Sequence, residues 1–405
     1  MRAVQPLLPA RPFTRQQLRL VGLLWMTGIL IGFAIAHAVN TLPFSRLTYV
    51  LTEGQMGFVL GAARLGALGA LAFSAYGDRR GRRGPFLAAL VVLFVATGAT
   101  ALAQNPLQFS IFQAAARMGA TAAAVLATVL LAEGLDPANR AYGISLFAAG
   151  GSFGAGLALL SLPVSDLGPE TWRALFALGA LGIIIVPFLA PRINESPVFR
   201  RPTTGVSIFT AMRYLMFWLL GAILFLAAAF TAVVAAFATE RLISDLGFSA
   251  GLAAAILLIG GTMGGIGFLV GGRLADAWGR RPAASFALTL ALIGGLGIYH
   301  LTHPVLLILT AAVGAYGTFS AAAPLGAQRT ELFPTDVRSN AGVWLNNLAV
   351  AGAATGLALG PLTIDQFGLG ATVTLLGVGM LVAALSVILL PETKGSRIDV
   401  TPAAS

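Results

Sequence analysis

A chain of 405 residues that is 57% hydrophobic and only 10% charged is not an ordinary soluble protein, in which charged residues make up about 25%. At about 20 apolar residues per membrane-spanning helix, this length accommodates about a dozen spans and excludes a large domain outside the membrane. The absence of cysteine excludes disulfides and zinc–thiolate sites. The net charge of +10 indicates either an anionic partner or retention of arginine on the cytoplasmic side of a membrane.

Twelve apolar runs are each long enough to cross a hydrocarbon layer of about 30 Å. In chain order they lie at 20–39, 55–76, 85–103, 107–132, 142–162, 173–190, 214–237, 250–271, 283–301, 305–328, 341–362 and 371–390. The residues outside them form an N-terminal tail at 1–19, a linker at 191–213 and a C-terminal tail at 391–405. The sequence therefore predicts an all-α membrane protein with twelve transmembrane helices.

The basic residues indicate how these helices are oriented. If the N-terminus is cytoplasmic, twenty of the 25 basic residues fall in inner segments, and only Arg46, Arg173 and Arg241 fall in outer ones. By the positive-inside rule, both termini are then cytoplasmic, and we expect a multi-pass protein of the cytoplasmic (inner) membrane. Because the basic clusters are short loops between helices, we expect no nucleic-acid partner.

The chain also contains an internal repeat. Charged residues at the inner ends of the spans recur at an offset of 198 residues, or 197 for the last pair. The pairs are Asp78 with Asp276, Glu133 with Glu331, and Glu195 with Glu392. This spacing predicts two six-span halves, 20–190 and 214–390, related as a parallel repeat. Secondary transporters use such halves to build a midplane site with alternating access.

The loop residues carry a family resemblance. The run GRLADAWGRR, from Gly272 to Arg281, resembles the signature loop of the major facilitator superfamily, and Asp78 to Arg83 is its first-half copy. The segments NESP (194–197), ELFPTDVR (331–338) and PETKG (391–395) resemble the sugar-porter and metabolite-symporter branches. The resemblance implies two pseudo-symmetric six-helix bundles.

The same resemblance implies a cytoplasmic gate, in which charged groups pair across the bundles in the outward-open state and separate when the cytoplasmic side opens. A carboxylate at a helix end beside guanidinium groups is suited to such a latch. The expected gating residues are Asp78, Arg82, Glu133, Arg140, Asp276, Arg280, Glu331 and Arg338. The alternative is that the arginines only set the orientation of the helices.

The acidic residues bear on proton coupling. All fifteen fall in loops, termini or helix ends. Proton-coupled carriers commonly use a buried Asp or Glu, so this distribution argues against ordinary sugar–proton symport. His37 lies inside the first span, whereas His300 and His303 flank a short outer turn, and His37 is therefore our proton-coupling candidate, with simple solvation near the helix end as the alternative.

Two arginines lie within predicted spans. At 1.5 Å per residue, Arg64 and Arg117 are each about 15–20 Å from a membrane face. An arginine at that depth is costly without a partner, and the spans contain no acid at mid-depth, so we expect one or both to attract an anionic group of the substrate. Bonding to backbone carbonyls is the alternative. The other candidates for substrate binding are Asn40, Gln113, Tyr316, Gln328, Asn346 and Asn347.

These observations predict a secondary transporter for a small polar metabolite. We favour an organic anion and leave ion or proton coupling open. Efflux of hydrophobic drug-like compounds, sugar transport and a non-transporting membrane receptor are the alternatives. We find no nucleophile–base set and no metal-ligand cluster, and we therefore expect no enzyme activity, no cofactor and no metal. The expected partners are the substrate, the lipid bilayer and a coupling ion, and we expect the protein to function as a monomer.

Overall fold

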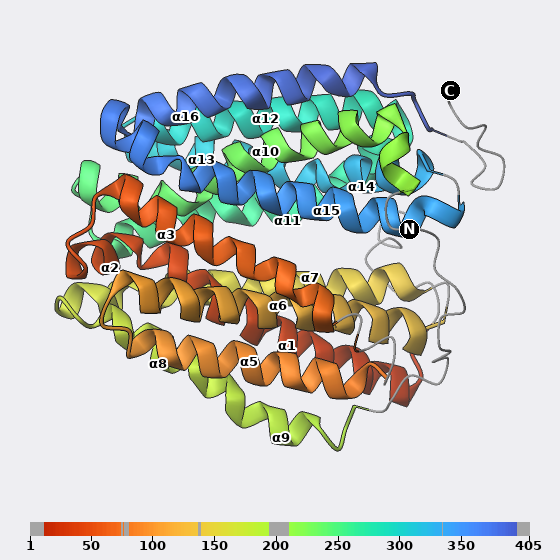
Figure 1. Ribbon diagram of the computed structural model, residues 1–405, viewed down its shortest axis with the longest axis horizontal. Helices are drawn as coiled ribbons and strands as arrows, with labels where there is room; N and C mark the ends of the chain where they lie inside the picture. Colours follow the sequence, from red (N-terminus) through yellow and green to blue (C-terminus); the bar gives the residue numbers. More distant parts are fainter. Residues whose placement is uncertain are drawn as a thin grey trace. The chain divides into compact units, whose positions relative to one another are not determined.

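The structure is a computed structural model that describes residues 12–73, 76, 81–136, 139–193, 210–333 and 335–394. Within these ranges, the side chains of 140–141, 210–211, 269, 330 and 335–340 are not described. Every regular element in the described part of the chain is a helix, as predicted (Figure 1). The chain divides into two compact units, which we describe separately.

Unit 1 comprises Met1–Ala38, Gly66–Val164 and Glu170–Thr203. Its helices are α1 (Arg15–Asn40, which ends in unit 2), η2 (Gly66–Gly69), α5 (Arg83–Ala101), α6 (Pro106–Gly134), α7 (Arg140–Ser161), η4 (Leu162–Leu167, which ends in unit 2), α8 (Trp172–Ala180), η5 (Leu181–Ile185) and α9 (Val186–Leu189). Helix α6 begins where capping chemistry predicts, because the Asn105 side chain accepts a hydrogen bond from the Gln108 N–H at 2.9 Å and Pro106 occupies the first turn.

Unit 2 comprises Val39–Leu65, Ser165–Pro169 and Thr204–Ser405. Its principal helices are α2 (Leu42–Thr48), α3 (Glu53–Leu65), α10 (Leu215–Glu240), η7 (Arg241–Asp245), α11 (Ala250–Trp278), α12 (Arg280–His300), α13 (Pro304–Ser320), α14 (Ala322–Glu331), α15 (Thr335–Ala358) and α16 (Gly360–Ser386). The N-terminus of α11 is capped by Ser249, which accepts from the Leu252 N–H at 3.3 Å.

Among the described residues, eleven helical stretches are long and apolar enough to cross a membrane. They correspond to eleven of the twelve predicted spans. The remaining predicted span, 341–362, corresponds to α15, which has 24 residues. Adjacent Asn346 and Asn347 make this helix less apolar than the others. The helical membrane fold predicted from the sequence is therefore present.

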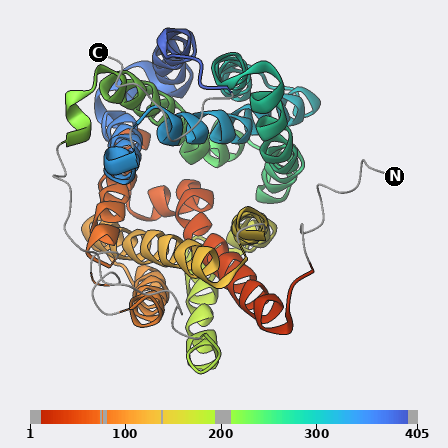
Figure 2. The ribbon, with the colours of Figure 1, turned by 90° about the vertical axis from the view of Figure 1, so that its right-hand side faces the viewer.

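Several predicted spans are not uniform helices in the described part of the chain. The sixth is divided into α8, the 3₁₀ segment η5 and α9, and Pro187 lies in α9. This yellow-green segment lies at the edge of unit 1 in both Figure 1 and Figure 2. Helix α16 begins before the last predicted span, 371–390, and its kink at Gly368 lies in the loop predicted between spans; the φ of 81° is accessible to glycine but strained for other residues.

Close helix packing in unit 2 depends on glycine at specific positions. A Cβ at Gly267 of α11 would lie 2.5 Å from the carbonyl oxygen of Tyr316 in α13. A Cβ at Gly61 of α3 would lie 2.8 Å from the carbonyl oxygen of Ala354 in α15. The contact of α3 with α15 explains why residues 39–65 belong to unit 2, although they precede the repeat boundary predicted from the sequence.

Candidate functional site

Arg117 lies near the middle of α6, eleven residues after its first residue, or about 17 Å along the helix axis. Its side chain is half-buried. The structure gives the Arg117 guanidinium no hydrogen bond, ion pair or ring contact with any described residue. A mid-membrane arginine without a protein partner can bind an anionic group, because a guanidinium offers five N–H donors in a planar arrangement.

The neighbours of Arg117 on α6 show which side of the helix it occupies. The buried Gln113 faces α5, where its Nε2 donates to Thr100 Oγ1 at 2.9 Å. Ala114 packs against η2, since a Cβ at Gly66 would lie 2.1 Å from the Ala114 carbonyl oxygen. At 100° per residue, Arg117 lies between these two directions, about 40° from Gln113 and 60° from Ala114. Arg117 therefore projects toward the interior of unit 1.

Gln113 is less suited to substrate binding than the sequence suggested. Its Nε2 is occupied by Thr100, whose hydroxyl in turn donates to the Ala96 carbonyl at 2.9 Å. This chain of hydrogen bonds joins α5 to α6 inside the apolar unit. The arrangement indicates a structural role for Gln113.

His37, near the end of α1, is fully buried rather than solvated. Its ring packs edge-on against Phe33 at a centroid distance of 4.6 Å and against Phe176 of α8 at 6.0 Å. The solvated alternative from the sequence is therefore wrong.

Arg64 belongs to unit 2 and lies on the face of α3 that packs against α15. It follows Gly57 and Gly61 at helical spacing, and Cβ atoms at those two glycines would approach the carbonyl oxygens of Leu357 and Ala354 at 3.0 Å and 2.8 Å. These contacts show that α3 and α15 run antiparallel. One further turn along α3 brings Arg64 to the level of Val350 in α15, which is one turn from Asn347. Arg64 and Asn347 thus lie on facing sides of α3 and α15.

The other candidates of unit 2 do not form one cluster. Asn346 is exposed, and Asn347 and Tyr316 are half-buried. The buried Gln328 has neither its Nε2 nor its Oε1 hydrogen-bonded to a described residue, and the same holds for Nδ2 of Asn40. Asn40 ends α1, whereas Gln328 lies three residues before the end of α14, so the two amides lie near opposite predicted membrane faces.

The second-half gating residues form a compact cluster within unit 2. Arg280 pairs with Asp276 at 2.6 Å and with Glu331 at 3.1 Å. Thr393 Oγ1 donates to Glu331 at 2.5 Å, and the backbone N–H groups of Arg280 and Arg281 donate to Glu392 at 2.7 and 3.0 Å. Sequence reasoning noted Glu392 only as part of the repeat and missed its role as a hydrogen-bond acceptor.

Glu392 lies outside the apolar stretches, and the pKa of its carboxyl group differs from the ordinary glutamate value. Burial raises the pKa of Glu392, but backbone N–H donors from Arg280, Arg281, Lys394 and Thr393 lower it, and the resulting pKa is below the ordinary glutamate value. The ionised carboxylate therefore links the start of α12 to the end of the described chain.

The first half contains the matching pair. Arg82 lies 3.7 Å from Glu133 in unit 1, at the positions equivalent to Arg280 and Glu331. Asp78 lies outside the described residues, as do the side chains of Arg140 and Arg338.

An ion pair that the sequence did not suggest lies at the predicted outer side of unit 2. Arg46 donates from Nε and Nη2 to Glu240 Oε1, at 3.0 and 2.6 Å. Glu240 is the last residue of α10, and its side chain is 0% exposed. The sequence alone did not indicate this burial. The only sequence signal was that Arg46 is one of three outer basic residues. Nearby, Asp365 accepts from the Gly54 N–H at 2.9 Å and from Thr52 Oγ1 at 2.7 Å.

Comparison with known proteins gives a consistent result. A family model described as Major Facilitator Superfamily matches residues 24–349. The chain is 28% identical to a "Probable 4-methylmuconolactone transporter" of Cupriavidus pinatubonensis over 88% of this chain and 86% of that protein. It is 25% identical to a "Gallate transporter" of Pseudomonas putida, over 98% and 96% of the two chains. Among solved structures, a D-xylose-proton symporter matches with a TM-score of 0.76 at 21% identity, over 94% of this chain and 99% of that one.

Proposed function

This chain belongs to the major facilitator superfamily and is a membrane transporter of small metabolites, and from that premise we propose that its substrates are small carboxylates carried on a ring. We propose that it lies in the cytoplasmic membrane with both termini inside and works as a monomer. The orientation is supported by the twenty basic residues on one side.

The observation that carries this proposal is the unpartnered guanidinium of Arg117. Fixed cations at mid-depth are expensive in a membrane and mark substrate or ion pathways. Arg117 lies in the interior of unit 1, away from lipid, and no described carboxylate neutralises it. An organic anion would supply the missing partner, whereas a neutral sugar or a cationic drug would not.

The names of the two relatives agree with this chemistry. Gallate and 4-methylmuconolactone are both ring compounds that carry a carboxylate. A binding site for them needs a cation for the carboxylate and amide or hydroxyl groups for the ring oxygens. In unit 2, Arg64, Asn347 and Tyr316 supply groups of these kinds, and we propose each of them as a substrate-binding candidate of that unit.

We propose further that movement between states breaks the two equivalent ion pairs, Arg82 with Glu133 and Arg280 with Glu331. Both pairs lie at inner helix ends, and each is partly exposed, so water can replace the lost contacts at little cost. Coupling to protons is proposed with His37 as the candidate group.

Binding of paired ligands tests the proposal. The dissociation constants of gallate and of its uncharged analogue methyl gallate are measured on the purified protein, and benzoate and methyl benzoate serve as a second pair. Because a hydrogen bond to a charged group contributes about 1.5–3 kcal/mol, we expect the acids to bind about 10–100-fold more tightly than the esters.

The variant Arg117→Met should remove this discrimination, since methionine fills similar space without charge. Arg117→Lys should retain part of it, because lysine keeps the charge but loses the bidentate geometry. Gln113→Leu is the matched control on the same helix and should leave the acid-to-ester ratio unchanged. Equal binding of acids and esters by the wild-type protein, or binding of xylose alone, would refute the proposal.

A further inference from the structure

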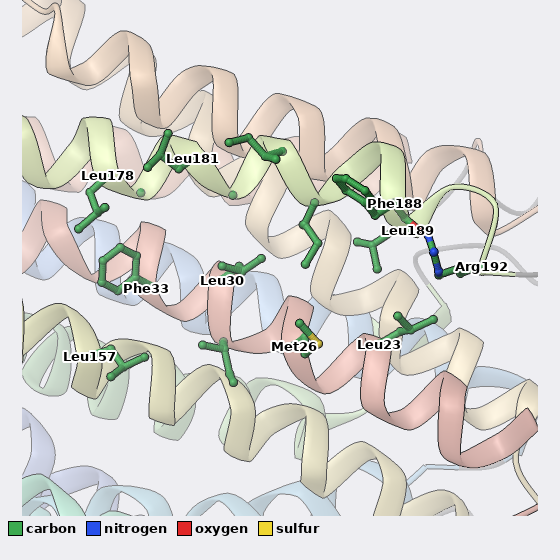
Figure 3. A pocket seen from close by; sticks show the side chains of 15 residues that line it. Leu23, Met26, Leu30, Phe33, Leu157, Leu178, Leu181, Phe188, Leu189 and Arg192 are labelled. Carbon is green, nitrogen blue, oxygen red and sulfur yellow. Dashed lines mark hydrogen bonds between the residues drawn. The ribbon is translucent and has the colours of Figure 1, made fainter. Parts of the chain in front are cut away.

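A hollow on the surface of unit 1 lies between α1, α7 and the divided segment α8 to α9 (Figure 3). Its volume is about 760 Å³. On α1, its lining follows one face of the helix through Leu23, Met26, Leu30 and Phe33. Figure 3 shows these side chains opposite those of Leu178, Leu181, Phe188 and Leu189, with Leu157 of α7 below them.

Local packing keeps the hollow open. Gly182 holds the middle of the divided segment against α5, because a Cβ there would meet the Phe94 ring at 2.3 Å. The opposite side of the segment has no described protein over it, and Leu181 and Phe188 are 55% and 58% exposed. The 3₁₀ turn η5 and Pro187 in the first turn of α9 prevent α8 from continuing into α9 as one regular helix.

The charge at one end of the hollow distinguishes it from ordinary lipid-facing surface. Arg192 is the only charged side chain among the described residues of the lining, and Figure 3 places it beside Phe188 and Leu189. Its Nη1 donates to the Phe188 carbonyl at 2.7 Å, and its side chain is exposed, so further N–H donors face outward. Arg19 is also exposed and lies four residues before Leu23, on the same face of α1 and toward the same end.

The dimensions fit one leaflet of a bilayer. Leu23 and Phe33 are ten residues apart, or about 15 Å along α1, which is half of a hydrocarbon core of about 30 Å. The arginines lie at the end of α1 that the positive-inside rule places in the cytoplasm, where the leaflet carries anionic lipid.

We propose that this hollow is a binding site for an anionic phospholipid, with an acyl chain along Phe33 to Leu23 and the phosphate group at Arg192 and Arg19. The apolar walls accept the hydrocarbon, and the two guanidinium groups select the charge of the headgroup. The site is separate from Arg117 and does not depend on the identity of the transported substrate.

Native mass spectrometry of the full chain in detergent tests this site, with dioleoyl phosphatidylglycerol and dioleoyl phosphatidylcholine as probes. The wild-type protein should retain phosphatidylglycerol at least tenfold better than phosphatidylcholine. Each arginine near a membrane surface contributes about fivefold in favour of anionic lipid, so Arg192→Gln should lower the preference about fivefold, and the double variant with Arg19→Gln should remove it.

The matched control is Arg273→Gln, which removes an exposed arginine from α11 of unit 2 and should leave the preference unchanged. A second variant, Met26→Trp, fills the hollow from an exposed position and should lower the retention of both lipids. The proposal is overturned if the wild-type protein retains the two lipids equally. It is also overturned if Arg273→Gln lowers the preference as much as Arg192→Gln does, if Met26→Trp has no effect, or if oleate binds in place of either phospholipid.

Discussion

The ion pair between Arg46 and Glu240 allows a quantitative prediction about what stabilises unit 2. Glu240 is 0% exposed and Arg46 is 16% exposed, so removal of the arginine leaves a buried carboxylate without its cation. Removal of one partner from a buried ion pair lowers the free energy of unfolding by about 3–5 kcal/mol. Because Arg46 is partly exposed, we expect Arg46→Ala to lower it by about 3 kcal/mol.

The matched variants separate charge from shape. Glu240→Gln keeps an acceptor oxygen for Arg46 and should cost about 1–2 kcal/mol. The double variant Arg46→Met with Glu240→Leu replaces both charges by apolar groups and should be within about 1 kcal/mol of the wild-type protein. Denaturant titration of the protein in detergent, followed by circular dichroism, gives the free energies of unfolding for the cycle. Costs that simply add in the double variant would refute the assignment of this contact as a stabilising pair.

The same pair connects residues from the two sequence halves, so its loss should also change access from the predicted outer side. The chain has no cysteine, so a single cysteine can be introduced without background labelling. Ala236 is buried one helical turn before Glu240. In the Ala236→Cys background, Arg46→Ala should raise the rate of labelling by a membrane-impermeant maleimide, whereas unchanged labelling would show that the pair does not control access.

Three further predictions concern packing, hydrogen bonding and pH. Gly267→Ala should destabilise the protein by about 1–3 kcal/mol, because the added Cβ would contact the Tyr316 carbonyl oxygen. Gly261→Ala is the control and should not destabilise it, because nothing lies within 4 Å of the added Cβ. Thermal unfolding measures both effects. Gln113→Leu should lower the free energy of unfolding by about 0.5–1.5 kcal/mol, because the hydrogen bond to Thr100 is lost. The affinity for gallate should stay the same, and a reduced affinity would show that Gln113 binds the substrate. Because the pKa of Glu392 is lower in the folded protein, its stabilising contribution is present above the ordinary glutamate pKa of about 4.3 and is lost as the pH falls through the lower folded value. Glu392→Gln should therefore remove part of the acid sensitivity of the melting temperature, and an unchanged pH profile would contradict this.

Features that depend on nearby residues could be predicted from the sequence. The apolar runs and the recurrence of Arg82 and Glu133 as Arg280 and Glu331 are set by local composition or by the repeat. The structure places both pairs within ion-pair distance. Apolar length alone predicted the sixth span as one helix, because neither the 3₁₀ turn nor the placement of Gly182 against Phe94 has a signal in hydropathy.

Features that depend on distant packing could not be predicted. Arg46 and Glu240 are 194 residues apart, and nothing in either local sequence indicates their contact. The burial of His37 between Phe33 and Phe176 likewise depends on how α8 packs on α1. Arg117 was predicted at mid-depth from its position in the span, but only the structure shows that no described side chain pairs with it.

Uptake by the protein in proteoliposomes tests the central claim most directly, namely that an organic anion supplies the missing partner of Arg117. Uptake of radiolabelled gallate should be competed by benzoate but not by methyl gallate or xylose, and Arg117→Met should lower it at least tenfold while the purified variant remains folded. Undiminished uptake by Arg117→Met, or uptake that only xylose competes, would contradict the account.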